Sequence, residues 1–420
     1  MIIMFIILLF SGMPVAFAMA ISGTLAVIGL GEVSPLLIPQ RLFMSLNSFP
    51  LLAVPFFILA GELMNAGGIT RRVVNFSKVL IGHLPGSLAQ VNVVSNIIMA
   101  GFSGSATADA VAIGSIMIPA MKKDGYPPGF AAGLTASAAC IGPIIPPSLV
   151  MVIYGAITGL SIGKMFLGGF IPGLAIGFGL MILVSLYARK YNWPCGEKPK
   201  ISKVISAFMG AFLALLAPVI ILGGIITGIT TATEAGVIAA VYALIIGLFI
   251  YKEITFRQIP KILVNAAINT AVPVIIISCS SIFGWVLARQ NFASSISNAL
   301  FGITANTYVL YFLIICILLI IGLFVEGMAA MLIFVPVLFP LGAQLGYDPI
   351  HFALVIIITI LIGTITPPVG LQLYVASSIA KVSISKVFIW PFVAVMVAVL
   401  LLITYVPSLV TFLPSLIFGD

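Results

Sequence analysis

A stretch of this sequence recurs 221 residues later, and most of the residues that recur are glycines and prolines. Ten of the 29 positions in residues 119–147 are identical to their counterparts in residues 340–368, without a gap. Glycine and proline determine backbone shape, so the repeat is structural and not merely compositional. Each copy ends in a motif that interrupts a helix, GPIIPP from Gly142 and GTITPP from Gly363. Two units built around a broken helix are typical of transporters.

The sequence around these units is too apolar for a water-soluble protein. Of its 420 residues, 62% are hydrophobic and 7% are charged, and the mean hydropathy is +1.31. Apolar runs of about 20 residues predict membrane-spanning helices, and the alternating pattern of a membrane β-barrel is missing from the sequence. We therefore expect an all-α polytopic membrane protein.

The apolar runs predict where the spans and arms lie. Residues 2–30 form one retained first helix, and residues 33–49 form an interfacial arm. A second arm at residues 253–268 leads into a span at residues 271–288. The last span covers residues 387–407.

The positive charges predict the orientation of the chain. If the first hairpin opens to the cytoplasm, 15 of the 18 lysines and arginines lie on the cytoplasmic side, as the positive-inside rule requires. The three exceptions are Arg41, Lys164 and Arg289. In the repeat, Lys122 and Lys123 align with Ala343 and Gln344, so one hairpin ends in positive charges and the other does not. We therefore expect two inverted repeats.

Inverted repeats would bring both hairpin turns and both helix breaks together near the middle of the membrane. Half-helix N-termini there offer N–H groups to an anion, and C-terminal ends offer carbonyl oxygens to cations. Hydroxyl groups come from Ser103, Ser105 and Thr107 in the first turn and from Thr364 and Thr366 in the second break. Such oxygen ligands suit a hard cation like Na⁺. The alternative is that these small residues only pack helices closely or hydrogen-bond to their own backbone.

Two acidic residues lie near the turns, Asp109 and Glu326. Because a charged group inside a membrane costs roughly 2.5 kcal/mol or more, each should serve a site or have a partner. We assign Asp109 to the structure of the first hairpin. Glu326 either contacts the site or accepts a hydrogen bond from the hairpin backbone, and the sequence leaves both roles open.

The segment Gly101–Gly104 reads GFSG, which also matches the GxSG motif around the nucleophile of rhomboid intramembrane proteases. Such an enzyme needs a histidine base. The two histidines, His83 and His351, fall at predicted membrane boundaries, and the second unit has Phe324 where Ser103 aligns. A rhomboid-like serine protease is therefore a remote alternative, and we do not expect an enzyme.

The motifs GSIMIPAMKKDGYPP with GPIIPPS, and VPVLFPLGAQLGYDP with GTITPPVG, resemble the large membrane subunit (DctM type) of tripartite ATP-independent periplasmic (TRAP) transporters. The resemblance covers nearly the whole chain. It implies a sodium-driven elevator in the bacterial inner membrane, with the N-terminus in the cytoplasm and the C-terminus in the periplasm. It also implies two or more coupling Na⁺ ions and no transition metal. The implied partners are a small four-helix membrane subunit and a periplasmic substrate-binding protein.

The resemblance also implies the site residues. Na⁺ would be held by Ser103, Gly104, Ser105, Gly142, Pro143 and Ile145 at a first site, and by Gly322, Phe324, Gly327, Gly363, Thr364 and Thr366 at a second. Substrate would contact Ser105, Ala106, Thr107, Pro146, Glu326, Gly327 and Pro367. Family substrates are organic acids, and we expect sialic acid first and a C4-dicarboxylate next. The alternative is a self-sufficient sodium:dicarboxylate symporter.

With these roles the chain divides into five regions. Residues 1–87 are the first scaffold and arm region, and residues 88–164 are the first transport unit, with a hairpin at 88–121 and a broken helix at 130–160. Residues 165–304 hold scaffold spans, a linker at 189–203 and the second arm. Residues 305–386 are the second transport unit, with a hairpin at 305–343 and a broken helix at 350–380, and residues 387–420 hold the final scaffold span.

The turns and breaks contain no lysine or arginine, so these loops offer no bidentate clamp for a carboxylate. We therefore expect coarse selectivity in this chain and fine discrimination by the periplasmic binding protein. The alternative is that Tyr154, Tyr374 or Gln372, on the half-helices beyond the breaks, shape a selective pocket.

Overall fold

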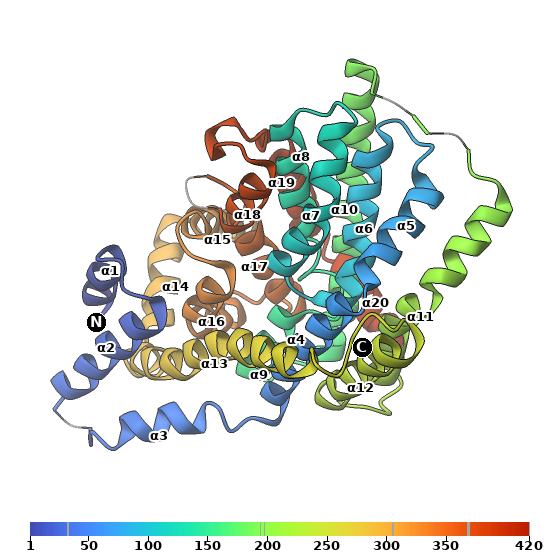
Figure 1. Cartoon of the computed structure of the whole chain (residues 1–420). Helices are drawn as coiled ribbons and strands as arrows, with labels where there is room; N and C mark the ends of the chain where they lie inside the picture. Colours follow the sequence, from blue (N-terminus) through green and yellow to red (C-terminus); the bar gives the residue numbers. More distant parts are fainter. Residues whose placement is uncertain (32, 194, 197, 305, 368–369, 420) are drawn as a thin grey trace.

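The computed structural model describes residues 1–31, 33–193, 195–196, 198–304, 306–367 and 370–419 (Figure 1). Helices make up 79% of the chain, and no β-strand is assigned among the described residues. The all-α prediction is therefore confirmed. Two predicted positions, Ala305 at the start of the second hairpin and Pro368 in the second break, lie outside the described residues.

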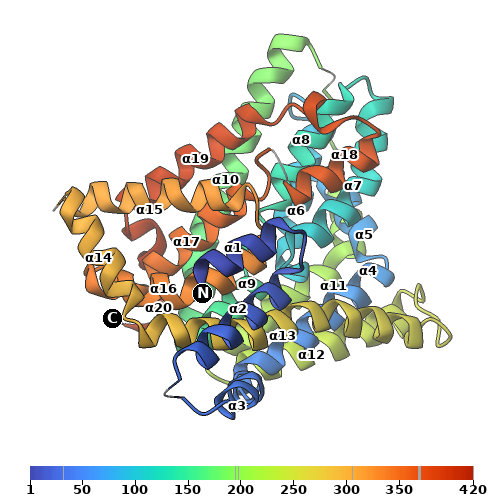
Figure 2. The ribbon, with the colours of Figure 1, turned by 90° about the vertical axis from the view of Figure 1, so that its left-hand side faces the viewer.

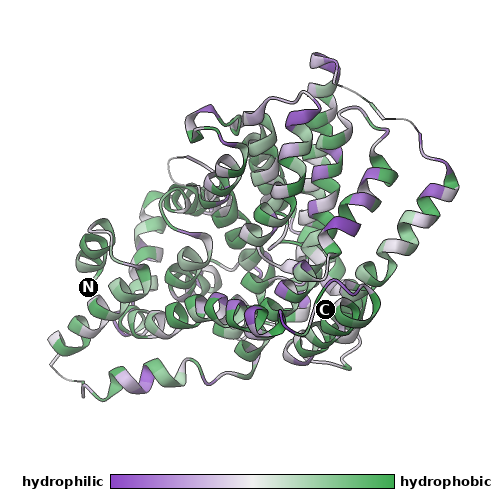
Figure 3. Cartoon of the chain, viewed as in Figure 1, coloured by the Kyte–Doolittle hydropathy of each residue, from purple (hydrophilic) through white to green (hydrophobic). Residues whose placement is uncertain are grey.

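Several helices are long and apolar enough to cross a membrane. By length and composition, the described part of the chain has six such stretches: Phe49–Ala66, which contains η1 (Phe49–Leu52) and α4 (Ala53–Ala66), α10 (Ile162–Tyr191), α11 (Ile201–Ile226), Ala232–Ile250, α13 (Ile259–Arg289) and α16 (Gly327–Gln344). Apolar residues line the outer helices as well as the inner ones (Figure 3), and α11 exposes Ile205, Met209 and Val219. Large exposed apolar faces of this kind belong against lipid.

The first hairpin consists of α6 (Ser87–Ser103) and α7 (Ala106–Lys123), joined by Gly104 and Ser105. The turn is this short because Gly104 takes a left-handed backbone conformation, with φ of 58°. A broken helix follows, with half-helices α8 (Pro128–Ala139) and α9 (Leu149–Thr158). These helices agree with the predicted hairpin and broken span.

The second unit repeats these boundaries. Its hairpin consists of α15 (Thr307–Gly322) and α16, and its half-helices are α17 (Pro349–Gly363) and α18 (Leu371–Ala380). Helices α7 and α16 both have 18 residues, and their first residues are 221 positions apart. The turn that follows each of these two helices also matches. Tyr126 N–H donates to Met121 O (3.0 Å), and Tyr347 N–H donates to Gly342 O (3.1 Å). The repeat seen in the sequence therefore reappears in local structure.

The two units pack directly against each other. Helix α18 of the second unit contacts α7 and α8 of the first, and α9 of the first contacts α16 of the second. The Cys140 thiol lies 3.7 Å from Leu361 O, and these two residues occupy equivalent positions of the repeat. Lys122 Nζ donates to Ala380 O at 2.8 Å. The breaks consequently face one another across a buried interface.

The N-terminal prediction was wrong. Residues 2–30 form two helices, α1 (Ile2–Phe10) and α2 (Val15–Gly29), which contact each other (Figure 2). Gly12, with φ of 86°, and Pro14 break the helix between them. The short helix α3 (Leu37–Met44) has no buried residue, as expected for an arm.

Three further boundaries differ from the predictions. The second arm and the following span form one continuous helix, α13, and Asn269, between the two predicted ranges, donates from Nδ2 to Glu62 Oε1 (2.8 Å) on α4. Helix α14 (Phe292–Ile303) was not predicted, and it bends by 119° into α15. The last span is α19 (Trp390–Tyr405), which bends by 56° into an unpredicted α20 (Ser408–Phe418).

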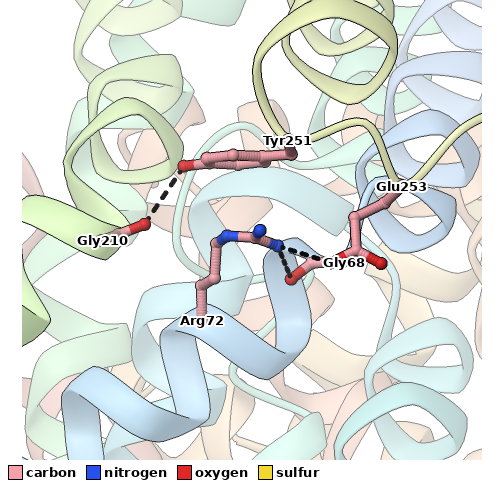
Figure 4. Close-up of polar contacts among 5 residues, drawn as sticks. All are labelled: Gly68, Arg72, Gly210, Tyr251 and Glu253. Carbon is pink, nitrogen blue, oxygen red and sulfur yellow. Dashed lines mark hydrogen bonds and ion pairs between the residues drawn. The ribbon is translucent and has the colours of Figure 1, made fainter.

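An arginine ties the amphipathic helix α5 (Ile69–Ile81) to its neighbours (Figure 4). Arg72 Nη1 lies 3.3 Å from Glu253 Oε1 and donates to Gly68 O at 3.1 Å. Its guanidinium stacks 3.7 Å from the ring centroid of Tyr251, whose hydroxyl donates to Gly210 O on α11. This Arg72 cluster connects α5, α11 and the loop that leads into α13. The loop follows η2 (Ile246–Ile250), which continues α12 (Ala232–Ile245).

Helix α10 packs closely against the first unit through glycines. Gly169, Gly173 and Gly177 lie on one face of α10, since helical positions four residues apart are neighbours. A β-carbon at Gly169 or Gly173 would collide with residues 144–145 of the first break, and one at Gly177 would collide with Ile97 of α6. Helix α10 therefore packs directly against the first break.

Candidate functional site

The tip of the first hairpin touches the first break, residues 140–148. A β-carbon at Gly104 would lie 2.7 Å from Pro147 O and 3.0 Å from Leu149 N, so no larger residue fits there without movement. Ser105 begins α7, and its hydroxyl accepts a hydrogen bond from Ala108 N–H at 3.4 Å. The tip thus presents the C-terminus of α6 and the N-terminus of α7 to the break.

Ser148 stabilises the non-helical backbone of the first break. Its hydroxyl donates to Pro143 O at 2.5 Å and accepts from Met151 N–H at 3.2 Å. The first of these bonds occupies a carbonyl inside the break, and the second caps the N-terminus of α9. Residues 140–148 belong to no helix. The N–H groups of residues 140–142, 144 and 145 donate to nearby carbonyls and the three prolines have no N–H, so turns replace the regular helical pattern here.

Asp109 faces the same break. Its side chain is 0% exposed, and neither carboxylate oxygen has a well-formed hydrogen bond within the described chain. The Ser103 hydroxyl lies near it, and a β-carbon at Gly142 would collide with Oδ2. Asp109, assigned from the sequence to the structure of the hairpin, thus lies beside Ser103 and Gly142, two residues predicted to hold the first Na⁺.

The second hairpin meets the second break through two glycines. A β-carbon at Gly363 would lie 2.5 Å from Gly322 Cα, so the two backbones are in direct contact. Nearby, the Thr364 hydroxyl donates to Leu361 O (2.7 Å) and the Thr366 hydroxyl donates to Ile362 O (2.9 Å). Each hydroxyl thereby uses its hydrogen and keeps oxygen lone pairs that could face a cation.

Glu326 caps the second hairpin turn. Its carboxylate accepts a hydrogen bond from Ala329 N–H at 3.0 Å and so stabilises the N-terminus of α16. Glu326 also lines the cavity described below, so the two roles left open by the sequence coexist. The side chain of Phe324, in contrast, is 54% exposed and faces an apolar crevice, so any ligand at this position would come from its backbone.

Both tips and the first break meet the half-helices α17 and α18 at one small cavity of about 40 Å³. Its lining consists of Gly104, Ser105, Ala106, Thr107, Pro143, Val150, Glu326, Gly327, Met328, Leu361 and Gln372. Among the predicted substrate residues, only Pro146 and Pro367 are missing from this lining. Of the predicted sodium residues, Gly104, Ser105, Pro143 and Gly327 take part. The structure therefore brings together most of the residues expected at the turns.

Gln372 is the polar residue of the cavity that the predicted site omitted. It was considered only as an alternative, together with Tyr154, which is fully buried, and Tyr374, which is 61% exposed. Neither tyrosine lines the cavity. The available signal was a glutamine close behind the second break, in a half-helix that otherwise begins with apolar residues.

A second, larger cavity is a crevice of about 460 Å³ between α1, α13, α14, α15 and α16. All of its lining residues are apolar, including Phe5, Phe283 and Phe324. Without polar groups it cannot compensate an anion for its lost hydration, so it is no candidate for the polar site.

The geometry does not assemble a serine protease. His351 uses its ring nitrogens on Ile403 O (2.8 Å) and the Tyr311 hydroxyl (3.4 Å). Within the described chain, neither histidine is hydrogen-bonded to Ser103, the nucleophile that this alternative requires.

Comparisons with known proteins agree with a permease. The chain is 37% identical over 414 residues to the sialic acid TRAP transporter large permease protein SiaM of Vibrio cholerae, covering 98% of this chain and 97% of that protein. It is 34% identical over 428 residues to the C4-dicarboxylate TRAP transporter large permease protein DctM of Rhodobacter capsulatus, covering 98% and 97%. It is 38% identical over 411 residues to the isethionate TRAP transporter permease protein DctMQ of Oleidesulfovibrio alaskensis, covering 97% of this chain and 65% of that protein.

A solved structure of similar fold and a matching family model also indicate a transporter. The YdaH transporter of Alcanivorax borkumensis has a similar fold, with a TM-score of 0.65 at 14% identity, covering 87% of this chain and 86% of that one. The family model for the tripartite ATP-independent periplasmic transporter, DctM component, matches residues 2–409. The chain therefore belongs to the DctM family of TRAP transporter large permeases, which are multi-pass membrane proteins.

Proposed function

We propose that this chain is the permease of a sodium-coupled importer of an organic acid, and that the acid binds where the two hairpin tips meet the first break. The observation that carries the proposal is the cavity shared by Ser105, Thr107, Pro143, Glu326 and Gly327, which come from both units. Unpaired backbone at such depth is tolerated when it lines a site.

The helix ends at the cavity supply the binding chemistry. The N-termini of α7 and α16 begin at Ala106 and Gly327, both in the lining, and such ends attract anions. The C-termini of α6 and α15 end at Ser103 and Gly322, whose carbonyl oxygens suit Na⁺. Two or more Na⁺ ions at these ends would neutralise part of the charge of the acid and couple its movement to the sodium gradient.

The packing of the two units supports an elevator. The matched helix boundaries support two repeats, and the split of 15 against three lysines and arginines supports their inversion, with the first hairpin open to the cytoplasm and the second to the periplasm. Because α18 contacts both α7 and α8, the two units can move as one body. We propose that residues 88–164 and 305–386 form this moving body and that the remaining spans form the scaffold.

The relatives support the class of substrate and the partners. Their names specify sialic acid, isethionate and C4-dicarboxylates, all of which are organic anions. We propose sialic acid as the first substrate to test and a C4-dicarboxylate as the next. The naming of the relatives as TRAP transporter permeases supports a small membrane subunit as a partner. A periplasmic binding protein would deliver the acid.

Uptake into proteoliposomes tests the proposal. The chain is reconstituted with its small subunit, the loaded binding protein is added outside, and Na⁺ is replaced by choline on both sides. We expect uptake only with Na⁺. Uptake that is unchanged in choline contradicts sodium coupling, and robust uptake by the isolated chain supports a self-sufficient symporter instead.

A further inference from the structure

The apolar crevice beside the second hairpin is too large to be a packing defect. Its volume is about 460 Å³, whereas protein interiors hold few voids larger than a water molecule. Its floor consists of buried side chains such as Phe5 and Leu318. Its rim consists of exposed side chains, among them Phe10, Ile317 and Phe324. The rim is therefore continuous with the exposed apolar surface that faces lipid.

The chemistry of the lining determines what can fill the crevice. All of its residues are apolar, and many of them belong to α13 and α16, which are long and apolar enough to cross a membrane. Water finds no hydrogen-bond partner in such a space, so an apolar cavity stays dry. A void left empty lowers stability in proportion to its volume, because the lining loses its van der Waals contacts. An apolar occupant is therefore required.

The shape of the crevice distinguishes between apolar occupants. Residues 2–10, 292–300 and 333–341 supply its walls on three helices, so it extends for about 12 Å at 1.5 Å per residue. A helix of that length and about 10 Å in diameter would need about 900 Å³, roughly twice the space available. An acyl chain is thinner, and the chains of one leaflet cover about 15 Å, half of the hydrocarbon core. The dimensions favour an acyl chain over a helix of another protein.

Contacts between helices bound the crevice and keep it open. Helix α1 meets α13 through Phe5 and Phe283, whose ring centroids are 5.1 Å apart. Helix α13 is close to α16, since a β-carbon at Gly284 would lie 3.1 Å from Pro336 Cβ. Phe5 is the one buried residue of α1 within the described chain, and α1 lies on the outside of the molecule (Figure 2). The crevice is thus a feature of the packing that opens towards the bilayer.

We propose that the crevice binds one acyl chain of a bilayer phospholipid, which runs between α1 and the second hairpin and reaches Phe324 near the hairpin turn. The site requires only that the chain lies in a membrane, as its family does. On the proposed elevator, α1 and α13 belong to the scaffold and α15 and α16 to the moving body, so a fluid chain fills the crevice while the two slide. This consequence rests on the proposed function, whereas the lipid site does not.

Photolabelling tests the site. The complex of this chain and its small subunit is reconstituted in liposomes with a trace of phosphatidylethanolamine that carries a diazirine in one acyl chain. One sample is irradiated directly, and another is irradiated after extraction and washing in detergent. Labelled peptides are identified by mass spectrometry. We expect label on residues 314–325 in both samples, because the crevice retains its chain, and loss of the label on the lipid-facing residues 205–219 of α11 after the wash.

Two tryptophan variants assign the label to the crevice. Val337→Trp places a large side chain in the lining and should abolish most of the label that survives the wash. Val219→Trp on the exposed face of α11 is the matched control and should retain that label. Size-exclusion chromatography shows whether each variant is folded, and the comparison of the two wild-type samples stands without them.

Three results would overturn the proposal. Residues 314–325 and 205–219 could lose label equally in the wash, which would show that no chain is held. Residues 314–325 could remain unlabelled while α11 is labelled, because the small subunit or another protein covers the crevice. Folded Val337→Trp could keep all of the label. Labelling does not require transport, so each of these results leaves the proposed permease function standing.

Discussion

The contact between Gly322 and Gly363 gives a sharp test of the second site. In Gly363→Ala, the new β-carbon would lie 2.5 Å from Gly322 Cα and 2.9 Å from its carbonyl carbon. Both are backbone atoms, which cannot rotate away as a flexible side chain could. Overpacking of this kind costs about 1–3 kcal/mol, and alanine recovers at most about 1 kcal/mol through its higher helix propensity.

A net penalty of about 1–2 kcal/mol corresponds to a factor of about 5–30 in an equilibrium constant. The penalty applies to the arrangement in which Gly322 of the second tip touches Gly363 at the second break, here called the closed arrangement. It disappears when these two residues move apart. If the closed arrangement binds Na⁺, Gly363→Ala should raise the Na⁺ concentration for half-maximal uptake by about this factor. Uptake into proteoliposomes, measured over a series of Na⁺ concentrations at constant ionic strength, gives this value.

The control is Gly223→Ala in α11, where an added β-carbon has no atom within 4 Å. This variant should show wild-type Na⁺ dependence. The reasoning is refuted if Gly363→Ala is produced as folded protein and its Na⁺ dependence equals that of Gly223→Ala, because the backbone contact would then have no part in ion binding.

Three other predictions follow from the fold and the site. In a cysteine-free background, Lys123→Cys and Ala343→Cys should react with a membrane-impermeant maleimide from opposite sides, because the two units are inverted. Ser103→Ala and Thr366→Ala should each raise the Na⁺ concentration for half-maximal uptake, since each removes an oxygen near a predicted ion. Arg72→Ala should lower the unfolding temperature modestly, because the ion pair is partly exposed and contributes about 0–1 kcal/mol and the stacking on Tyr251 about 0.5–1 kcal/mol.

Each of these has its own contrary result. Labelling of both cysteines from the same side of intact cells would exclude inverted units. Unchanged Na⁺ dependence in both hydroxyl variants would remove the side-chain oxygens from the ion sites. For Arg72, the matched comparison is Arg72→Lys, which keeps the charge and loses the planar stack. Equal stability of Arg72→Lys and wild type would show that stacking contributes nothing measurable.

The broken-helix units were predictable because glycine and proline act through the backbone. Single prolines such as Pro172 and Pro218 lie inside helices of this chain, but three prolines within residues 143–147, next to Gly142, interrupt the helix, so the first break lies where the sequence placed it. The same logic was available at Gly12 and Pro14, but the surrounding apolar run suggested one span. Hydropathy reports burial in lipid or protein and says little about whether a helix is continuous.

The boundaries that failed depend on partners far away in sequence. Residues 269 and 270 separated the predicted arm from the predicted span, whereas in the structure α13 continues through them and Asn269 donates to Glu62 of α4. Helix α14 is a short segment that packs against α13 and α16. Gln372 lines the cavity for a similar reason, because part of the lining, residues 104–107, 143 and 150, comes from more than 200 positions earlier in the chain.

The glycine face of α10 determines which substitutions this helix can tolerate. At Gly169 an added carbon meets the backbone carbonyl oxygen of Ile144, so even alanine should be poorly tolerated there. At Gly173 and Gly177 it meets the side chains of Ile145 and Ile97, which can shift, so leucine should be rejected more firmly than alanine. At Gly223 of α11 there is open space, and most apolar residues should be accepted. A saturation-mutagenesis map of growth on the transported acid would therefore distinguish helices packed inside the protein from helices facing lipid. Such a map would trace the boundary of the first unit by genetics alone.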